Sequence, residues 1–432
     1  MVDQLQRACL DARGVEAGHL HLGQGVGEED DDDGREHEQR ERGVREGSDG
    51  AHGDLLQTGP VGRKGRSRPF HTPHLKIAWS GQDGLVHVVV IDPNLPAVAA
   101  ELEAALDAAA PGARVSWHPR FDKQAVARDL PGAEVLVASR YTASLVPLSS
   151  SLRLLQCPAA GLDAIDTGAL PAGVLLANTG HHERSIAEHV LAGVVVLRRR
   201  VREQDVALRE RGEWASSTFD ASLPLARGLD GARVGFVGFG AIGRACWAPF
   251  AALGAVGAAV TGSGRLDAGA HGLAWAGGVD EPGHLDRLVG ESDVVVLSAP
   301  LTPATTGLVD DRLLSLAPPG AVLVNVGRGP LVDEDALFEA LASGRLGGAV
   351  LDVWWRYPGG GAAGGSAGSA SGSAGPVVGA PGTREWGALA NVVASPHSSS
   401  ITRQTLLARV ADVVENVRRL TTGEPLVNTI PR

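Results

Sequence analysis

The stretch Val234-Gly235-Phe236-Val237-Gly238-Phe239-Gly240-Ala241-Ile242-Gly243 decides the fold. It opens as an apolar strand and ends in the pattern GxGxxG, where a helical pattern begins. In that context Gly238 makes the tight turn, Gly240 lets the backbone approach a pyrophosphate, and Gly243 lets the helix pack on the strand. In a chain with 58 glycines the spacing alone would be weak. Its place between a strand and a helix predicts a dinucleotide site at a helix N-terminus.

The same alternation of strand-like and helix-like segments extends in both directions from this stretch. Apolar runs before it lie at 86–92, 114–119, 133–139 and 152–157, with a helix at 95–109; from it onward they lie at 232–240, 255–262, 293–300, 321–327, 348–353 and 391–397, with a helix at 333–343. A long helix at about 185–211 joins the two series. This pattern predicts an α/β fold of two Rossmann-like domains, each a parallel sheet flanked by helices.

Two segments have the composition of disordered chain. Residues 1–82 are rich in glycine and charge and show no sustained apolar period, so they predict a disordered extension that cannot offset its ordering entropy. An acidic interaction tail is the alternative. Because Met1 is the only methionine, a native start downstream, at a valine such as Val86, also stays open. Residues 359–382 (GGGAAGGSAGSASGSAGPVVGAPG) predict a flexible insertion.

The composition argues against several kinds of partner. A formal net charge of −11 disfavours nucleic acid and anionic membranes, so a small molecule is expected. The longest apolar run, 245–260, is too short to span a membrane, and no signal peptide opens the chain. Three cysteines far apart predict neither a disulfide framework nor a zinc site. The adjacent His181 and His182 are better explained as solvated or hinge residues, so we expect a cytoplasmic protein without a metal.

The second strand of the dinucleotide domain bears on the choice of nucleotide. An acidic residue at its end would bind the ribose diol of NAD. This strand instead ends in Thr261-Gly262-Ser263-Gly264-Arg265, where Thr261, Ser263 and Arg265 are candidates to bind a 2′-phosphate. Since an arginine near a turn is often only solvated, NAD and NADP both stay open.

Two residues at strand ends suggest chemistry on a small acid. Arg328 follows the apolar strand at 321–327, and ligands of open α/β sheets bind outside the carboxyl ends of strands. Its planar fork suits a carboxylate. His397 follows the strand at 391–397 and titrates near neutral pH. A lone histidine there is often structural, but together the two supply what reduction of a 2-oxo acid needs: an anchor for the carboxylate and a proton donor.

Several long motifs in order now point to a family. From about Val86 to the C-terminus the chain resembles the D-isomer-specific 2-hydroxyacid dehydrogenases, with GFVGFGAIG followed by SDVVVLSAPLTPATTGLV (292–309), VNVGRGPLVDEDALFEAL (324–341), LDV (351–353) and NVVASPH (391–397). The resemblance implies a substrate domain at 83–184 completed by 402–432, an NAD(P)-binding domain at 185–401, and a homodimer.

The resemblance also implies roles for individual residues. Arg328 binds and polarises the substrate and His397 donates or accepts the proton. The backbone at Ala159, Ala160 and Gly161 cradles the substrate carboxylate, although the family more often has glycine where Ala159 stands. The resemblance also places Asp352 beside the nicotinamide. Together with the glycine motif and the candidates at the end of the second strand, the residues expected to bind the cofactor are Gly238, Gly240, Ala241, Ile242, Gly243, Thr261, Ser263, Arg265, Pro300 and Asp352.

The stretch Asp352-Val353-Trp354-Trp355-Arg356-Tyr357-Pro358 departs from the family. The family has a glutamate before this proline, paired with the histidine, and here the position is Tyr357. An adjacent carboxylate raises a histidine pKa by ~1–3 units, so His397 is expected to be less protonated and reduction to favour acidic conditions. Tyr357 either orients the ring through its hydroxyl or faces elsewhere with Trp354 and Trp355. Formate dehydrogenases, which resemble the family, also lack the glutamate. Formate-type hydride transfer and nucleotide sensing without turnover are therefore the alternatives to a 2-oxo acid reductase.

Overall fold

The computed structural model describes residues 85–358 and 379–432. All described residues belong to one compact unit, Lys76–Arg432. The extension expected at 1–82 and most of the insertion expected at 359–382 lie outside the described residues. Within the described ranges, no helix is long and apolar enough to cross a membrane. The same ranges contain no group of three or more His, Cys, Asp or Glu residues that could hold a metal ion.

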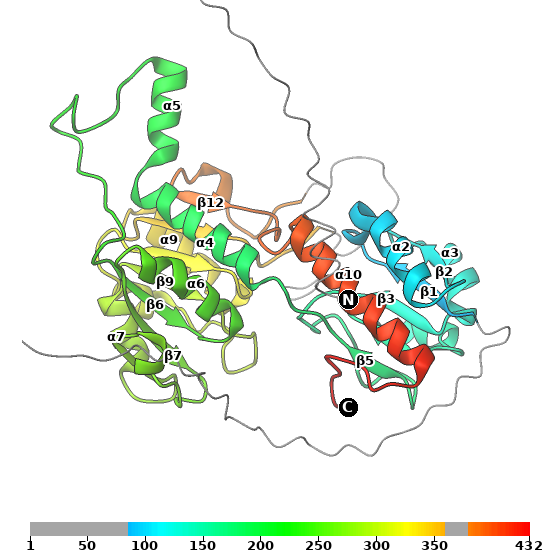
Figure 1. The fold of residues 1–432 in the computed structure, drawn as a ribbon. Coiled ribbons are helices and arrows are strands. Elements are labelled where there is room, and N and C mark those ends of the chain that lie inside the picture. The colour runs from blue at the N-terminus through cyan, green and yellow to red at the C-terminus, as the bar shows by residue number, and fades with distance from the viewer. Residues whose placement is uncertain (1–84, 359–378) are drawn as a thin grey trace, which may run out of the picture. The chain divides into compact units, whose positions relative to one another are not determined.

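The first lobe is built on a five-stranded parallel sheet with strand order β2-β1-β3-β4-β5. Its strands are β1 (His87–Ile91), β2 (Arg114–Trp117), β3 (Val135–Ala138), β4 (Leu154–Gln156) and β5 (Leu175–Ala177). Its helices are η2 (Leu95–Val98), α2 (Ala99–Ala109), α3 (Lys123–Asp129), η3 (Leu130–Gly132) and η4 (Ala143–Leu148), joined by the C-terminal α10 (Arg403–Thr422). Figure 1 shows α10, in red, beside α2, and the two helices are in contact.

The second lobe is built on a seven-stranded parallel sheet with strand order β12-β11-β10-β9-β6-β7-β8. Its strands are β6 (Arg233–Val237), β7 (Val256–Thr261), β8 (Trp275–Gly278), β9 (Val294–Leu297), β10 (Val322–Asn325), β11 (Gly348–Leu351) and β12 (Val392–Ala394). Its helices are α4 (Glu183–Arg198), α5 (Val201–Arg211), α6 (Ala241–Ala252), η5 (Gly269–His271), α7 (His284–Glu291), α8 (Asp311–Ser315), η6 (Gly329–Leu331), α9 (Glu334–Ala342) and η7 (Trp386–Ala388).

Helices cover both faces of each sheet, which explains the unbroken apolar strands. On the second sheet, α4 and α6 pack on one face, and α7, α8 and α9 pack on the other. On the first sheet, α2 and α10 share one face, and α3 with η4 takes the other. Strands β3, β9 and β10 are buried at every position. The predicted fold class, two parallel sheets flanked by helices in Rossmann-like order, is confirmed.

The single long helix expected at 185–211 is wrong. The chain forms α4 and α5 with a break at Arg199 and Arg200, and Arg200 adopts a left-handed φ of 54°. The carbonyl of Arg198, which would continue the helical ladder, instead accepts a 3.1 Å hydrogen bond from the N–H of Arg227. Helix α4 carries a buried apolar face, whereas only Ala207 of α5 is buried. The apolar face therefore stays on the sheet, and the polar continuation leaves it (Figure 1).

Strands β5 and β8 were not expected from the sequence. Strand β5 has only three residues, and β8 reads WAGG, with two glycines that weaken a strand pattern. Both are edge strands that pair with an interior neighbour. Each forms because it pairs with a neighbouring strand, and a local sequence pattern does not contain that information.

Candidate active site

The turn between β6 and α6 has the geometry that its glycines predict. Gly238 has a left-handed φ of 87°, and a Cβ there would lie 2.9 Å from the amide nitrogen of Ala299. A Cβ on Gly243 would lie 2.8 Å from the carbonyl oxygen of Gly238. At Gly240 nothing lies within 4 Å of the Cβ position. The chain path therefore requires glycine at 238 and 243, while the space over Gly240 is open.

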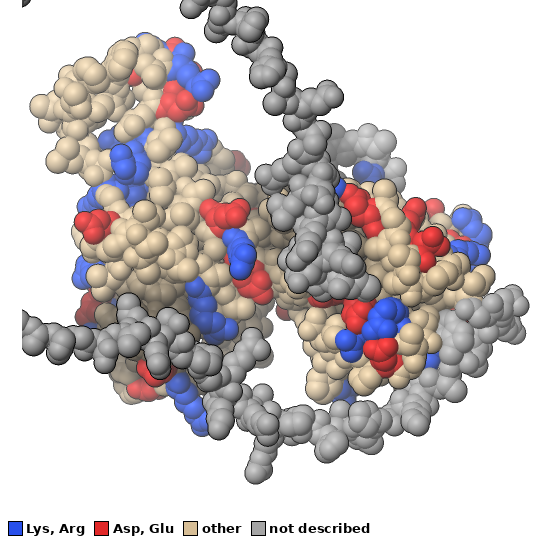
Figure 2. Space-filling model, viewed as in Figure 1, with Lys and Arg blue, Asp and Glu red and all other residues tan. Residues whose placement is uncertain are grey.

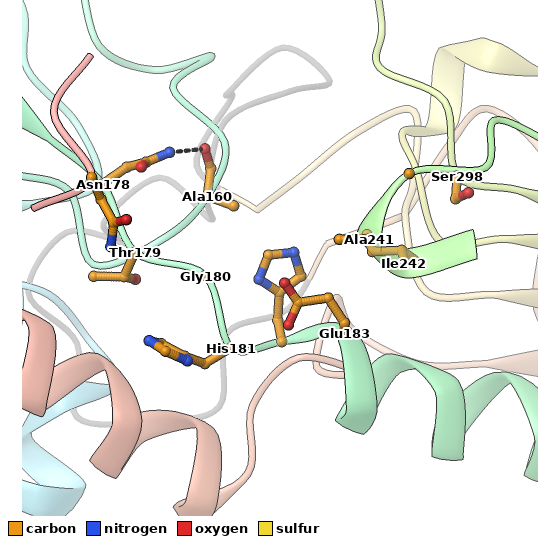
Figure 3. Close-up of a pocket in the computed structure, with 12 residues that line it drawn as sticks. Ala160, Asn178, Thr179, Gly180, His181, Glu183, Ala241, Ile242 and Ser298 are labelled. Atoms are coloured by element: carbon orange, nitrogen blue, oxygen red, sulfur yellow. Dashed lines mark hydrogen bonds between the residues drawn. The ribbon is translucent and has the colours of Figure 1, made fainter. Parts of the chain in front are cut away.

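A cavity of about 510 Å³ lies against this turn. In Figure 3, Ala241, Ile242 and Ser298 form one wall, opposite Ala160 and Asn178 of the first lobe. Helix α6 has no side-chain cap, so its first N–H groups are available to an anion. The open space over Gly240, the uncapped helix and the cavity fit the pyrophosphate of a dinucleotide.

The end of β7 carries polar groups beyond this turn. The hydroxyl of Thr261 accepts a 3.2 Å hydrogen bond from the N–H of Gly264, and the hydroxyl of Ser263 accepts a 3.3 Å bond from the N–H of Arg265. Ser263 and Arg265 are exposed. The loop is ordered by its own hydroxyls and presents a cation at its end.

His397 lies on a loop after β12 that a buried carboxylate holds in place. Asp352, at the end of β11, is 1% exposed. Its carboxylate accepts bonds from the hydroxyl of Ser395 at 2.6 Å, from the N–H of Ser398 at 2.8 Å, and from both the N–H and the hydroxyl of Ser399. These donors flank His397, which has a left-handed φ of 58°. Asp352 therefore fixes a strained loop that presents the histidine.

The hydroxyl of Tyr357 lies 3.0 Å from Nδ1 of His397. It also accepts a 3.3 Å bond from the N–H of Trp354. Of the two orientations left open by the sequence, Tyr357 thus faces the histidine. The tryptophans still form an aromatic wall, because Trp355 stacks on Trp386 with ring centroids 5.1 Å apart. Trp354, Trp355 and Tyr357 belong to the same short stretch, so this aromatic packing also holds the backbone that carries Tyr357.

The electrostatics of this pair follow from burial. Burial lowers the pKa of His397; Asp352 raises it, Arg328 lowers it further and Asp163 raises it. Burial raises the pKa of Tyr357, so the hydroxyl stays neutral at physiological pH. A neutral partner orients the imidazole without the charge that would stabilise its protonated form.

Arg328 follows β10 and reaches the first lobe. Its Nη1 donates to the Gly327 carbonyl at 2.8 Å, and its Nη2 lies 2.5 Å from Oδ2 of Asp163. Its Nε is buried and has no partner among the described residues. The amide of Asn325 donates to the Arg328 carbonyl at 2.9 Å and steadies the loop. One buried N–H of the guanidinium is thus left for a ligand.

The loop Ala159–Gly161 lies against this arginine. The Ala160 carbonyl accepts a 2.9 Å bond from the amide of Asn178, drawn dashed in Figure 3. Within the described residues, the N–H groups of Ala160 and Gly161 have no acceptor. A Cβ on Gly161 would lie 2.5 Å from Nη2 of Arg328. The unpaired N–H groups of this loop and the guanidinium of Arg328 therefore lie close together.

Comparison with known proteins places the chain in a family. Residues 191–399 match the family described as D-isomer specific 2-hydroxyacid dehydrogenase, NAD binding domain. The hydroxyphenylpyruvate reductase of Plectranthus scutellarioides is 30% identical over 297 residues, which are 67% of this chain and 81% of that protein. The chain belongs to the D-isomer specific 2-hydroxyacid dehydrogenase family.

Other members of the family differ in length and function. The D-3-phosphoglycerate dehydrogenase of Mycobacterium tuberculosis is 30% identical over 319 residues, which are 72% of this chain but 53% of that protein. The chain thus spans about half the length of such relatives. The solved NADPH-dependent glyoxylate/hydroxypyruvate reductase of Sinorhizobium meliloti, in complex with NADP and sulfate, is 27% identical, with a TM-score of 0.60 over 80% of this chain and 98% of that one.

The structure brings together most of the residues that the sequence singled out in this family member. Arg328 and His397 follow β10 and β12, two strands on the same side of the nucleotide turn in the sheet. The charges of Arg328 and Asp352 both act on the pKa of His397. Pro300 is exposed, and its carbonyl accepts a 2.7 Å bond from the hydroxyl of Thr305. His181 contacts Asp412 at 2.9 Å.

Sequence reasoning missed Asp163, Trp386 and the serines around His397. The serines had a signal, since Ser395 and Ser398-Ser399-Ser400 flank the histidine directly. Asp163 had none, because its partner Arg328 is 165 residues away. Trp386 lies beyond the insertion and stacks across it.

Proposed function

We propose that the protein is an NAD(P)-dependent oxidoreductase that interconverts small 2-oxo and 2-hydroxy acids of the glyoxylate and hydroxypyruvate type. The observation that carries the proposal is the convergence of Arg328 and His397 at the carboxyl end of the sheet that bears the dinucleotide turn. Family membership supports it, and relatives include a glycerate dehydrogenase and the Sinorhizobium glyoxylate/hydroxypyruvate reductase.

The cofactor would lie with its pyrophosphate over Gly240 and the start of α6, and its nicotinamide toward Asp352. When bound, it supplies or accepts the hydride. Thr261, Ser263 and Arg265 support NADP as well as NAD, because they offer hydroxyls and a cation and no carboxylate.

The chain's own residues would handle the acid and the proton. The guanidinium of Arg328 and the N–H groups of Ala160 and Gly161 hold the substrate carboxylate, with Ala159 completing the loop, and Arg328 polarises the carbonyl. In the protonated ring, Nδ1–H of His397 donates to the hydroxyl of Tyr357, so that Nε2–H is left to protonate the carbonyl oxygen. Oxidation of the hydroxy acid reverses this transfer.

The test is oxidation of NADH and NADPH with glyoxylate and hydroxypyruvate, comparing wild type with His397→Ala. Loss of a general acid is expected to lower kcat by ~10²–10⁴-fold while nucleotide affinity, followed by tryptophan fluorescence, changes less than about twofold. Turnover that survives the substitution would contradict the proposal. Nucleotide binding with no turnover of any 2-oxo acid would instead support the sensing alternative.

We also propose a homodimer in the cytoplasm. The arm formed by α5 and residues 212–226 exposes Leu208, Trp214, Phe219 and Leu225, the last at 81%. Figure 2 shows the arm as mostly uncharged surface beyond the charges of α5. A second copy covers such a patch with the same patch by twofold symmetry. Light scattering tests this. Wild type is expected to have twice the mass of one chain and Trp214→Asp the mass of one chain, and a monomeric wild type would contradict the proposal.

The cysteines support the cytoplasm as the compartment. Cys157 and Cys246 are both buried and free, which suits a reducing compartment.

A further inference from the structure

The carboxylate of Asp163 occupies the spot where the proposed function puts the carboxylate of the substrate. Its Oδ2 lies 2.5 Å from Nη2 of Arg328. The same oxygen lies 2.9 Å from the position of a Cβ on Gly161. Gly161 and Ala160 are the residues whose N–H groups have no acceptor among the described residues. An acidic side chain of the protein thus lies beside the donors that would receive an acid.

This ion pair is well placed to exchange with a ligand. The side chains of Arg328 and Asp163 are 22% and 36% exposed, so water and small anions reach them. Pairs this exposed contribute little to stability, and the guanidinium of Arg328 keeps a buried Nε without a partner in the described chain. A substrate that brings two oxygens offers Arg328 more than the single contact with Asp163.

We propose that Asp163 determines substrate selectivity: its carboxylate competes with the substrate for Arg328, so that the site accepts small monoanionic 2-oxo acids and disfavours those with a second negative charge. This inference rests on the proposed function. A monoanion bound to Arg328 replaces the single negative charge of the Asp163 carboxylate that it displaces. A dianion brings one more negative charge, and the displaced Asp163, still tethered beside it, repels that charge.

The surroundings of Asp163 add to this selectivity. Asp163 and Asp166 both line a second cavity of about 340 Å³, together with Arg140 and Tyr141. Two carboxylates against one arginine make this cavity a poor host for a distal carboxylate or phosphate. Asp166 does not pair with Arg328 and instead accepts a 3.1 Å bond from the N–H of Ala169. It therefore provides a matched control.

The experiment compares wild type with Asp163→Asn, Asp163→Ala and Asp166→Asn. Substrates are glyoxylate, a monoanion, and oxaloacetate, a dianion, each with NADH or NADPH. Both Asp163 variants are expected to lower KM about threefold to fivefold for glyoxylate, as befits loss of a half-exposed ion pair, and about tenfold for oxaloacetate. The value of kcat should change less than about twofold. Asp166→Asn should leave KM for glyoxylate unchanged, because Asp166 does not pair with Arg328, and should lower KM for oxaloacetate less than either Asp163 variant does.

An opposite result overturns the inference. If Asp163 serves only to orient Arg328, Asp163→Ala raises KM for glyoxylate, and the ratio of the two KM values stays at the wild-type level. Calorimetric titration of oxamate, a monoanionic 2-oxo acid analogue, into the protein with bound nucleotide separates this inference from the proposed function. Tighter oxamate binding by the Asp163 variants in a protein without turnover would contradict the function and support the competition. Unchanged or weaker oxamate binding would contradict the competition itself.

Discussion

Two regions lie at the carboxyl end of one sheet: the nucleotide turn, 238–243, and the acid/base edge, which consists of Asp352, Tyr357, His397 and Ser399. They are built from different parts of the chain. The turn is made of backbone: Gly238, Gly240 and Gly243 lie within six residues, and their roles follow from φ and free space. The edge is made of side chains: Tyr357 meets His397 across 40 residues, and Asp352 meets Ser399 across 47. Backbone sites therefore follow from local sequence, whereas side-chain sites depend on partners that folding brings together.

The prediction with the largest expected effect removes the carboxylate of Asp352, which holds the loop that carries His397. Asp352→Ala leaves the N–H groups of Ser398 and Ser399 without an acceptor in a loop where Ser399 is buried and Ser398 is exposed. An unsatisfied buried donor costs about 1–3 kcal/mol, so the free energy of unfolding is expected to fall by about 2 kcal/mol, mostly through Ser399. The value of kcat is expected to fall by about 100-fold or more as His397 loses its position. Urea unfolding and steady-state kinetics measure the two effects.

The isosteric variant separates position from stability. Asp352→Asn keeps one acceptor oxygen, so it is expected to retain more stability than Asp352→Ala while still losing activity. An Asp352→Ala protein that is as stable and as active as wild type would show that the loop is held by its own backbone.

The second test restores charge to the edge. Reduction needs protonated His397, and burial lowers its pKa, so the wild-type rate is expected to rise as pH falls below the ordinary histidine value of about 6.5. In Tyr357→Glu the new carboxylate stabilises the imidazolium and raises the pKa by ~1–3 units, which extends activity to neutral and higher pH. Profiles of kcat from about pH 5 to 9 measure the shift.

Tyr357→Phe is the matched control. It keeps the ring but removes the hydroxyl that contacts Nδ1, so its rate is expected to fall about tenfold without an upward shift of the profile. Superimposable profiles for wild type and Tyr357→Glu would mean that position 357 does not govern the proton donor.

The two regions also divide what the sequence could and could not predict. The parallel sheets, the turn after β6, and the placement of Arg328 and His397 at strand ends follow from apolar runs and glycine spacing. The break at Arg200 did not, because it depends on the Arg227 N–H taking the carbonyl of Arg198. The orientation of Tyr357 stayed open for the same reason, since a hydroxyl next to an aromatic pair has two reasonable positions. Asp163 had no local signal at all. Each miss is a contact between residues far apart in the chain.

A third test probes the backbone site, where two glycines should fail in different ways. Gly238→Ala puts a Cβ 2.9 Å from the Ala299 nitrogen at positive φ, which is expected to cost about 1–2 kcal/mol of stability from the conformation alone. Gly240→Ala meets nothing within 4 Å, so stability should be unchanged while NADH binding weakens about tenfold, because the Cβ enters the space for the pyrophosphate. Equal effects of the two variants on melting temperature would contradict the assignment.

The smallest expected effect concerns nucleotide choice, where backbone and side chain meet at the end of β7. The exposed Arg265 would add one charge-assisted contact to a 2′-phosphate, and a contact at an exposed site is worth a fraction of a kcal/mol to about 1 kcal/mol. Arg265→Ala is therefore expected to weaken NADPH binding about fivefold and to leave NADH binding unchanged, as measured by fluorescence titration. Arg312→Ala, which removes an exposed arginine paired with Asp286 in the same lobe, should change neither. A wild type that binds NADH far more tightly than NADPH would show that the hydroxyls of Thr261 and Ser263 serve the ribose diol instead.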